Sequence, residues 1–180
     1  AGLSGPFLPS SHGGIATSVM LLLHGWGANG NDLADITRPY ADRFPGMAFF
    51  VPNAPNPCKM NPTGYEWFDI DDRIHGPDYI EPIIQSALTE LLYTLNLKAS
   101  SLVLAGFSQG GMMSLHCGLR MQPPPAALVS FSGALLRHDD LPLSQAHIFP
   151  PVQLVHGTDD QIVPYALMTQ SLSSLESIGV

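Results

Sequence analysis

Short apolar runs recur along the chain, and each one stops at a segment that contains glycine or proline. A short continuous run of this kind is typical of a strand that is buried on both faces. We therefore predict strands wherever these runs occur. The runs comprise residues 18–23, 48–51, 101–105, 126–131 and 152–155.

Segments with helical periodicity lie between these runs. The clearest is 80–95, in which Ile and Leu recur at spacings of three and one and form a single apolar stripe. Asn31 or Asp32 is suited to cap an earlier helix, while Pro164 and Gly179 suit the start and end of a last one. We expect these further helices over residues 31–44, 109–119 and 164–178.

Strands that alternate with helices predict an α/β fold, in which a mostly parallel sheet carries helices on both faces. The 180 residues suit one domain, 1–180, with a sizeable buried core. In sheets of this class, ligands bind beyond the carboxyl ends of the strands. We therefore searched for candidate chemistry in the segments that follow the apolar runs.

Charge and composition narrow the range of partners. Seven Lys and Arg against fifteen Asp and Glu give a formal charge of -8, which argues against nucleic acid or an anionic membrane surface. No apolar run approaches the roughly 20 residues of a membrane span, and residues 1–11 lack the features of a signal peptide. Cys58 and Cys117 make neither a disulfide framework nor a metal-ligand spacing, so we expect a cytoplasmic location, with no metal and no organic cofactor.

A nucleophile motif follows the run at 101–105. Residues 106–110 read G-F-S-Q-G, the G-x-S-x-G pattern of a sharp strand-to-helix turn that holds a serine hydroxyl clear of the sheet. The pattern alone is weak, but here a buried strand precedes it and a helical segment follows it, as the chemistry requires. We interpret Ser108 as a nucleophile rather than as an idle residue in a structural turn.

An oxyanion hole is predicted beside it. His24, Gly25, Trp26 and Gly27 follow the first run, and an H-G-x-G loop can direct a backbone N–H at developing negative charge. The second donor would be the N–H of Gln109, directly after the nucleophile. We favour this function for the Trp26 N–H, and for the His24 side chain we prefer a structural role as a buried hydrogen-bonding group.

A candidate acid follows the run at 152–155. Asp159 and Asp160 lie in the segment H-G-T-D-D-Q-I-V-P, and an Asp at such a position can hold a histidine ring in the required tautomer. Either Asp could instead cap the helix that starts near Pro164. Spacing does not choose between the two.

Together these motifs resemble the phospholipase/carboxylesterase family of α/β-hydrolases, which includes the acyl-protein thioesterases. The resemblance runs from L-S-G-P at the start through L-L-H-G-W-G-A-N-G-N-D-L, V-P-N-A-P, E-W-F-D-I and G-F-S-Q-G-G-M to H-G-T-D-D-Q-I-V-P. It implies the α/β-hydrolase fold and selects Asp160 as the acid. It also assigns the oxyanion donors to the backbones of Trp26 and Gln109.

The resemblance further implies a wall for the acyl group of the substrate. The W-F-D segment makes Trp67 and Phe68 candidate wall residues, although without the resemblance both would be interpreted as core aromatics. Met112 follows the nucleophile motif closely and is a candidate either for substrate contact or for core packing. The implied function is a serine carboxylesterase that hydrolyses esters, acyl thioesters or lysophospholipids through an acyl-serine intermediate.

One component of this site is missing from the sequence. The family has its catalytic His after the acid, whereas no His follows His156 here, so we expect the His beyond Val180, together with a last strand and helix. The unpaired sheet edge that this leaves would favour a homodimer. The alternatives are a non-catalytic binding protein on the same fold and an inactive truncated fragment. A peptidase or a dienelactone-type hydrolase is a further alternative, and the serine at position 108 argues against the latter.

Overall fold

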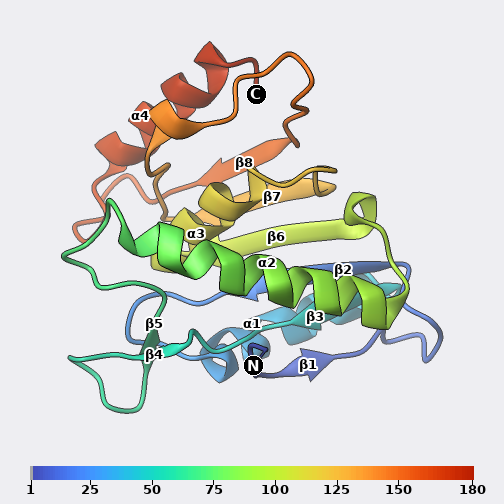
Figure 1. Cartoon of the computed structure of the whole chain (residues 1–180). Coiled ribbons are helices and arrows are strands. Elements are labelled where there is room, and N and C mark those ends of the chain that lie inside the picture. The colour runs from blue at the N-terminus through green and yellow to red at the C-terminus, as the bar shows by residue number, and fades with distance from the viewer. Residues whose placement is uncertain (1) are drawn as a thin grey trace.

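The structure of the protein is a computed structural model that describes residues 2–180. Five of its strands lie parallel in one six-stranded sheet, and an edge strand, β1, pairs antiparallel with β3. The order across the sheet is β1-β3-β2-β6-β7-β8 (Figure 1). The strands of this sheet are β1 (Phe7–Leu8), β2 (Ser18–Leu23), β3 (Met47–Phe50), β6 (Leu102–Phe107), β7 (Ala127–Phe131) and β8 (Val152–Val155).

Helices cover both faces of the sheet, as predicted. Figure 1 shows α2 in front of the strands and α1 behind them, with α4 near β8. The long helix α2 packs on α3, which in turn packs on β6 and β7. The helices are α1 (Gly30–Arg43), α2 (Gly76–Leu95), α3 (Gln109–Gly118) and α4 (Tyr165–Ser177), with short 3₁₀ turns η1 (Ala99–Ser101) and η2 (His138–Asp140).

The buried strands supply a core on each side of the sheet. Because side chains alternate along a strand, Leu21 and Leu23 of β2 pack toward the larger cluster beneath α2 and α3, and Leu22 packs toward the smaller one beneath α1. Strand β8, which pairs only with β7 in the sheet, is less buried than the central strands. Burial on both faces therefore accounts for the continuous apolar runs of the central strands, where helices cover the sheet on each side.

The structure differs from the sequence predictions in three local features. The cap of α1 is Asn29 rather than Asn31 or Asp32, because the Asn29 side chain accepts from the Asn31 N–H while Asp32 accepts from the Asn29 N–H in a reciprocal capping box. The segment 52–62, in which no strand is predicted, contains β4 (Asn56–Pro57), which pairs antiparallel with β5 (Tyr65–Glu66). Strand β1 was not predicted, because two residues are too few to show a pattern.

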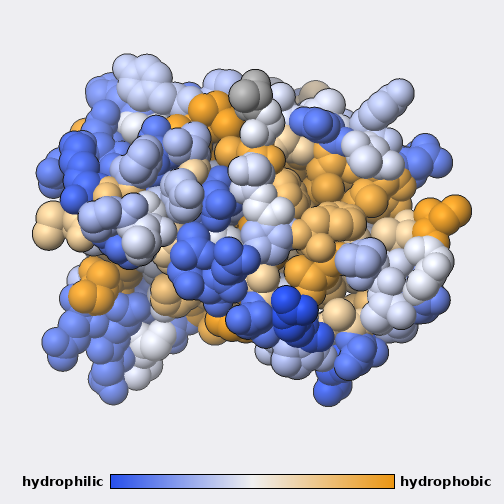
Figure 2. Space-filling model, turned by 90° about the horizontal axis from the view of Figure 1, so that it is seen from below, coloured by the Kyte–Doolittle hydropathy of each residue, from blue (hydrophilic) through white to orange (hydrophobic). Residues whose placement is uncertain are grey.

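Apolar side chains also reach the surface along the β1 edge. Figure 2 views the molecule from this side and shows an apolar area framed by polar residues. Phe7 of β1 is 45% exposed and lines a shallow hollow together with Leu3, Phe50 and Leu91. None of the helices within residues 2–180 combines the length and the apolar character that a membrane span would need.

One glycine of this fold provides a direct test of its packing. A Cβ at Gly110 would lie 2.1 Å from the Leu23 carbonyl oxygen, because α3 starts against the end of β2. We expect Gly110→Ala to lower the free energy of unfolding by about 3 kcal/mol or more, since backbone atoms must shift. Gly157→Ala is the matched control, because a Cβ there meets nothing within 4 Å. Urea unfolding with equal midpoints for the two variants would contradict the close contact.

Candidate active site

The nucleophile turn has the conformation that the motif predicts. Ser108 lies between the end of β6 and the start of α3, with φ 52° and ψ −117°. A non-glycine residue in this conformation is strained by about 1–3 kcal/mol and is held by the surrounding structure. Its N–H donates to the Phe131 carbonyl at 2.8 Å, and its carbonyl accepts from the Met112 N–H at 3.0 Å.

The glycine that precedes the turn is required by close backbone contact. A Cβ at Gly106 would lie 2.1 Å from the Gly110 carbonyl oxygen, so no side chain fits between the strand and the first turn of the helix. The two glycines of the motif therefore serve packing, while Ser108 itself adopts the positive φ. This is the structural reason for the G-x-S-x-G spacing in this chain.

A cavity of about 440 Å³ lies in front of Ser108, at the carboxyl ends of the parallel strands. Several lining residues come from the segments that follow β2, β6, β7 and β8, because the ends of parallel strands meet at one edge of the sheet. Of the sequence-predicted residues, the cavity brings together Trp26, Phe68, Ser108, Gln109, Met112 and Asp160.

Trp67 is the one predicted site residue that does not line this cavity. Its side chain is fully buried, and its indole N–H donates to the His24 carbonyl oxygen at 2.8 Å. This position is that of a core aromatic, which is the alternative interpretation of Trp67 from sequence. Phe68, the next residue, is the one of the pair that lines the cavity.

Gln109 connects the nucleophile turn to this aromatic segment. Its side-chain oxygen accepts from the Trp67 N–H at 2.8 Å, and its side-chain nitrogen donates to the Phe68 carbonyl oxygen at 2.7 Å. Both bonds are buried, so their loss would leave unpaired polar groups. The side chain thus holds Phe68 against the cavity.

Two backbone N–H groups at the cavity fit the expected oxyanion donors. Gln109 is the first residue of α3, where helix geometry leaves the N–H without an intrahelical acceptor. The Trp26 N–H makes no backbone hydrogen bond within the described part of the chain, unlike the N–H groups of Gly27 and Ala28. The positive end of the α3 dipole also favours negative charge near this point.

His24 has the structural role that we prefer for it from sequence. Its Nε2 accepts from the Ala54 N–H at 2.9 Å, so the proton lies on Nδ1, which donates to the Gly25 carbonyl oxygen at 2.8 Å. Burial lowers the pKa of His24, which keeps the ring neutral in this tautomer. Both ring nitrogens are occupied, and the ring is not available as a base.

Asp160 lies on the cavity, and Asp159 does not. The Asp160 Oδ1 accepts from the N–H groups of Ile162 and Val163, each at 2.9 Å, which orders the turn that leads to α4. The hydrogen bond from the Val163 N–H, followed by that from Ile162, holds the pKa of Asp160 below its ordinary value of 3.8. The carboxylate therefore orders the turn before α4 and lies at the cavity as a charged group, but it does not cap α4, whose N-cap is Pro164 without a side-chain hydrogen bond.

The histidines of the described residues lie away from this cavity. His156 is the one nearest Asp160 in sequence, but its Nε2 lies 2.7 Å from the Val163 carbonyl oxygen and 3.6 Å from Asp160 Oδ2. It lines an apolar hollow next to α1 instead. Within residues 2–180, the residues that line the Ser108 cavity include no histidine.

Sequence reasoning missed several residues at this site. Ser132 follows β7 with φ 47° and lines the cavity, as do Ile70 and Arg73 from the loop before α2. A polar residue directly after a predicted strand is the signal that would have identified Ser132. The loop residues carry no comparable pattern.

Among residues 2–180, no group of three or more His, Cys, Asp or Glu side chains is arranged to hold a metal ion.

The sheet and the site together define a class of protein. A mostly parallel sheet with a serine in a strained turn between a central strand and its helix is characteristic of the α/β-hydrolase fold. The chain belongs to the phospholipase/carboxylesterase family, whose family model matches residues 10–179. It is an enzyme of this hydrolase family.

Individual relatives agree with this assignment. The crystal structure of esterase PE8 superposes with a TM-score of 0.92 at 38% identity and covers 100% of this chain and 86% of its own. Acyl-protein thioesterase 1 of Emericella nidulans is 28% identical over 187 residues, which cover 91% of this chain and 78% of the relative. Esterase YpfH of Escherichia coli is 28% identical over 170 residues, which cover 91% and 71%, respectively.

Proposed function

We propose that the protein is a serine esterase that hydrolyses carboxylic esters or acyl thioesters through an acyl-Ser108 intermediate. The observation that carries this proposal is the position of Ser108, which adopts a strained turn at a cavity shared with two free N–H donors and a carboxylate. The names of the relatives, esterase and acyl-protein thioesterase, support the same substrate class.

The chemistry proceeds in two steps. The Ser108 hydroxyl oxygen attacks the carbonyl carbon, its proton passes to a general base, and the N–H groups of Trp26 and Gln109 stabilise the oxyanion. The intermediate collapses to the acyl-serine, and the leaving alcohol or thiol takes that proton from the base. In the second step the base takes a proton from water, which attacks the acyl carbon. The bond to the serine oxygen then breaks, the acid is released, and the serine oxygen regains a proton from the base.

The acyl group of the substrate has an apolar wall in this cavity. Phe68, Met112, Ile162 and Leu167 all line it. A volume of about 440 Å³ lies within the usual range for small-molecule sites. We assign the acyl group to this wall, with Phe68 fixed by the Gln109 side chain.

The general base is the remaining component. Because no histidine lines the cavity within residues 2–180, we assign the base to a histidine outside residues 1–180. Asp160 would accept a hydrogen bond from that ring and hold it in the tautomer that takes the proton from Ser108.

Covalent labelling tests the proposal directly. We expect a fluorophosphonate probe, or a rapidly quenched p-nitrophenyl ester, to leave one adduct on the protein. Tandem mass spectrometry should place that adduct on Ser108 rather than on Ser132, which also lines the cavity, because Ser108 directly precedes the Gln109 N–H at the start of α3. Ester turnover without an adduct at Ser108, or with the adduct on another residue, would contradict the serine mechanism.

A further inference from the structure

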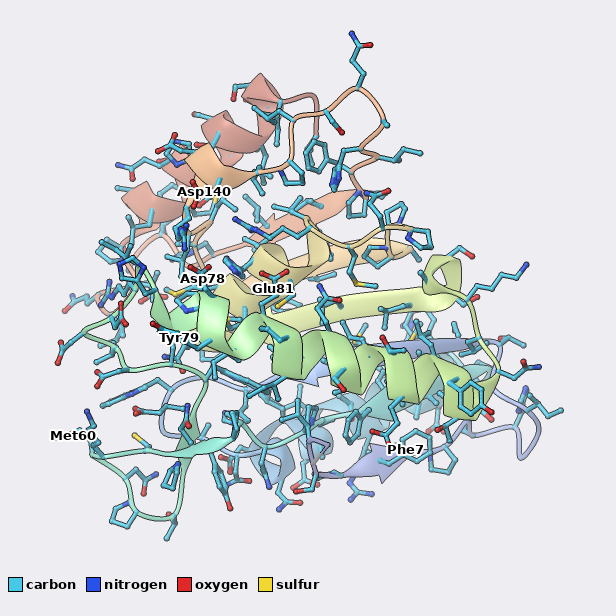
Figure 3. The ribbon with its side chains drawn as sticks, in the orientation of Figure 1. Phe7, Met60, Asp78, Tyr79, Glu81 and Asp140 are labelled. Carbon is cyan, nitrogen blue, oxygen red and sulfur yellow. The ribbon has the colours of Figure 1, made fainter. Side chains whose placement is uncertain are left out.

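The β4–β5 hairpin packs against the loop that carries one of the proposed oxyanion donors. We define this oxyanion loop as residues 24–28, between β2 and α1. The hairpin extends from the body of the molecule, and Met60 marks its outer end (Figure 3). Its base joins directly to Trp67 and the acyl wall.

Backbone hydrogen bonds connect the hairpin to Gly27 and Ala28, at the C-terminal end of the oxyanion loop. The Gly27 N–H donates to the Tyr65 carbonyl oxygen at 2.9 Å, and the Tyr65 N–H donates to the Ala28 carbonyl oxygen at 2.8 Å. The Asn61 side chain adds a bond to the Gly27 carbonyl oxygen at 2.7 Å. A Cβ at Gly64 would lie 2.0 Å from that same oxygen, so the two segments are in direct contact.

Trp26 itself is held through its side chain. Its indole N–H donates to Oε2 of Glu66 at 2.6 Å, and Glu66 is only 5% exposed. Glu66 is presented by β5, opposite Asn56 of β4, so the position of its carboxylate is set by the hairpin. A hydrogen bond to an ionised carboxylate is roughly twice as strong as a neutral one, and burial strengthens it further.

The backbone around Trp26 is held by hydrogen bonds, since the Gly25 carbonyl oxygen accepts from His24 Nδ1 at 2.8 Å and from the Ala28 N–H at 3.1 Å. Gly25 and Gly27 flank Trp26, and Gly27 has φ +75°. Because both neighbours are glycines, neither contributes a side chain that packs beside Trp26. The Trp26 N–H makes no backbone hydrogen bond within residues 2–180. The indole bond to Glu66 adds a restraint on the Trp26 side chain to these backbone bonds.

We propose that Glu66 is a positioning residue, which holds the Trp26 indole and through it aims the Trp26 N–H at the oxyanion. This inference rests on the proposed function, because it assigns a task to Glu66 within the same site. An interaction realised only in the transition state changes kcat and leaves KM almost unchanged. Glu66 itself does not line the cavity, so it acts through Trp26 rather than on substrate.

A double-mutant cycle on a p-nitrophenyl ester, in the protein that includes the proposed base histidine, tests this inference. We expect Glu66→Leu to lower kcat about tenfold or more with KM within about twofold, since loss of a whole oxyanion donor costs about 10²–10³. Glu66→Gln keeps an acceptor for the indole N–H and should recover most of the rate. Trp26→Phe keeps the backbone donor but loses the tether, so it should match Glu66→Leu, and the double variant should fall no further.

Several outcomes would overturn the inference. Additive losses in the double variant, a raised KM with unchanged kcat, or a Glu66→Gln variant as slow as Glu66→Leu would each exclude a tether. A lower melting temperature for Glu66→Leu that Glu66→Gln shares would indicate a purely structural role. If the unmodified protein is active through Ser108 but Glu66→Leu is unaffected, only this inference fails. If Ser108→Ala retains full activity, the proposed function fails first.

Discussion

Ser108→Ala is expected to lower kcat for ester hydrolysis by a factor on the order of 10⁶ in the protein that includes the proposed base histidine, which is the loss seen when a nucleophile is removed from a catalytic triad. The methyl side chain fits the turn, and the oxyanion donors remain in place. The residual rate should therefore reflect only substrate binding and stabilisation of the oxyanion by Trp26 and Gln109. KM should change little, because the hydroxyl contributes to the reaction rather than to binding.

The control is a second serine of the same strand–turn–helix unit. Ser114 lies in α3, where its hydroxyl donates to the Gly111 carbonyl oxygen at 2.8 Å, and it does not line the cavity. Ser114→Ala should keep kcat within about threefold, because loss of one buried hydroxyl has a small effect on stability. Steady-state hydrolysis of p-nitrophenyl butyrate measures both variants. Equal rates for the two would exclude Ser108 as the nucleophile.

Asp160→Asn is the second large effect, with an expected fall in kcat on the order of 10⁴. The Asn side-chain oxygen can still accept from the Ile162 and Val163 N–H groups, so the turn before α4 should persist. What is lost is the negative charge that orients and stabilises a protonated histidine. The control is Asp159→Asn, since Asp159 is exposed and lies off the cavity, and its kcat should stay near that of the unmodified protein.

The pH profile adds a check on the same residue. Hydrogen bonds from Val163 and Ile162 lower the pKa of Asp160 below 3.8, so its charge is lost only as the pH falls below that value. Above it the carboxylate is ionised, and the Asn variant should show the same fractional loss from about pH 8 to pH 9, where a histidine of ordinary pKa is neutral. The acid limb of kcat/KM for the unmodified protein should then have a midpoint near the ordinary histidine value of about 6.5. A midpoint that follows Asp160 would contradict this assignment.

The sequence predicts most of the sheet because burial on both faces leaves a clear mark. The runs at 18–23 and 152–155 match β2 and β8 at both ends, and the nucleophile turn lies where the glycine spacing places it. The helix predicted over 80–95 in fact begins at Gly76. Its first four residues contain no Ile or Leu, so the apolar stripe does not extend over them and the true start was missed. Spacing alone does not decide whether Asp159 or Asp160 is the acid, since both follow the same strand.

What could not be predicted depends on contacts between distant segments. The β4–β5 hairpin was hidden by prolines and by the shortness of its strands, although its base positions the wall segment. The bond from Trp26 to Glu66 joins residues 40 positions apart, which no periodicity reveals. Trp67 and Phe68 are adjacent in sequence, and only their different burial contacts separate the core residue from the cavity residue.

Gln109 contributes to the site through both its backbone and its side chain, and this limits what a substitution there can reveal. Its backbone N–H serves the oxyanion hole, and every substitution except proline retains that group. Its side-chain amide bridges the Trp67 N–H and the Phe68 carbonyl oxygen. A slower variant at this position would therefore report how far Phe68 has shifted, and the strength of the oxyanion donor would remain hidden from conventional mutagenesis. Replacing the amide linkage by an ester is what would expose it.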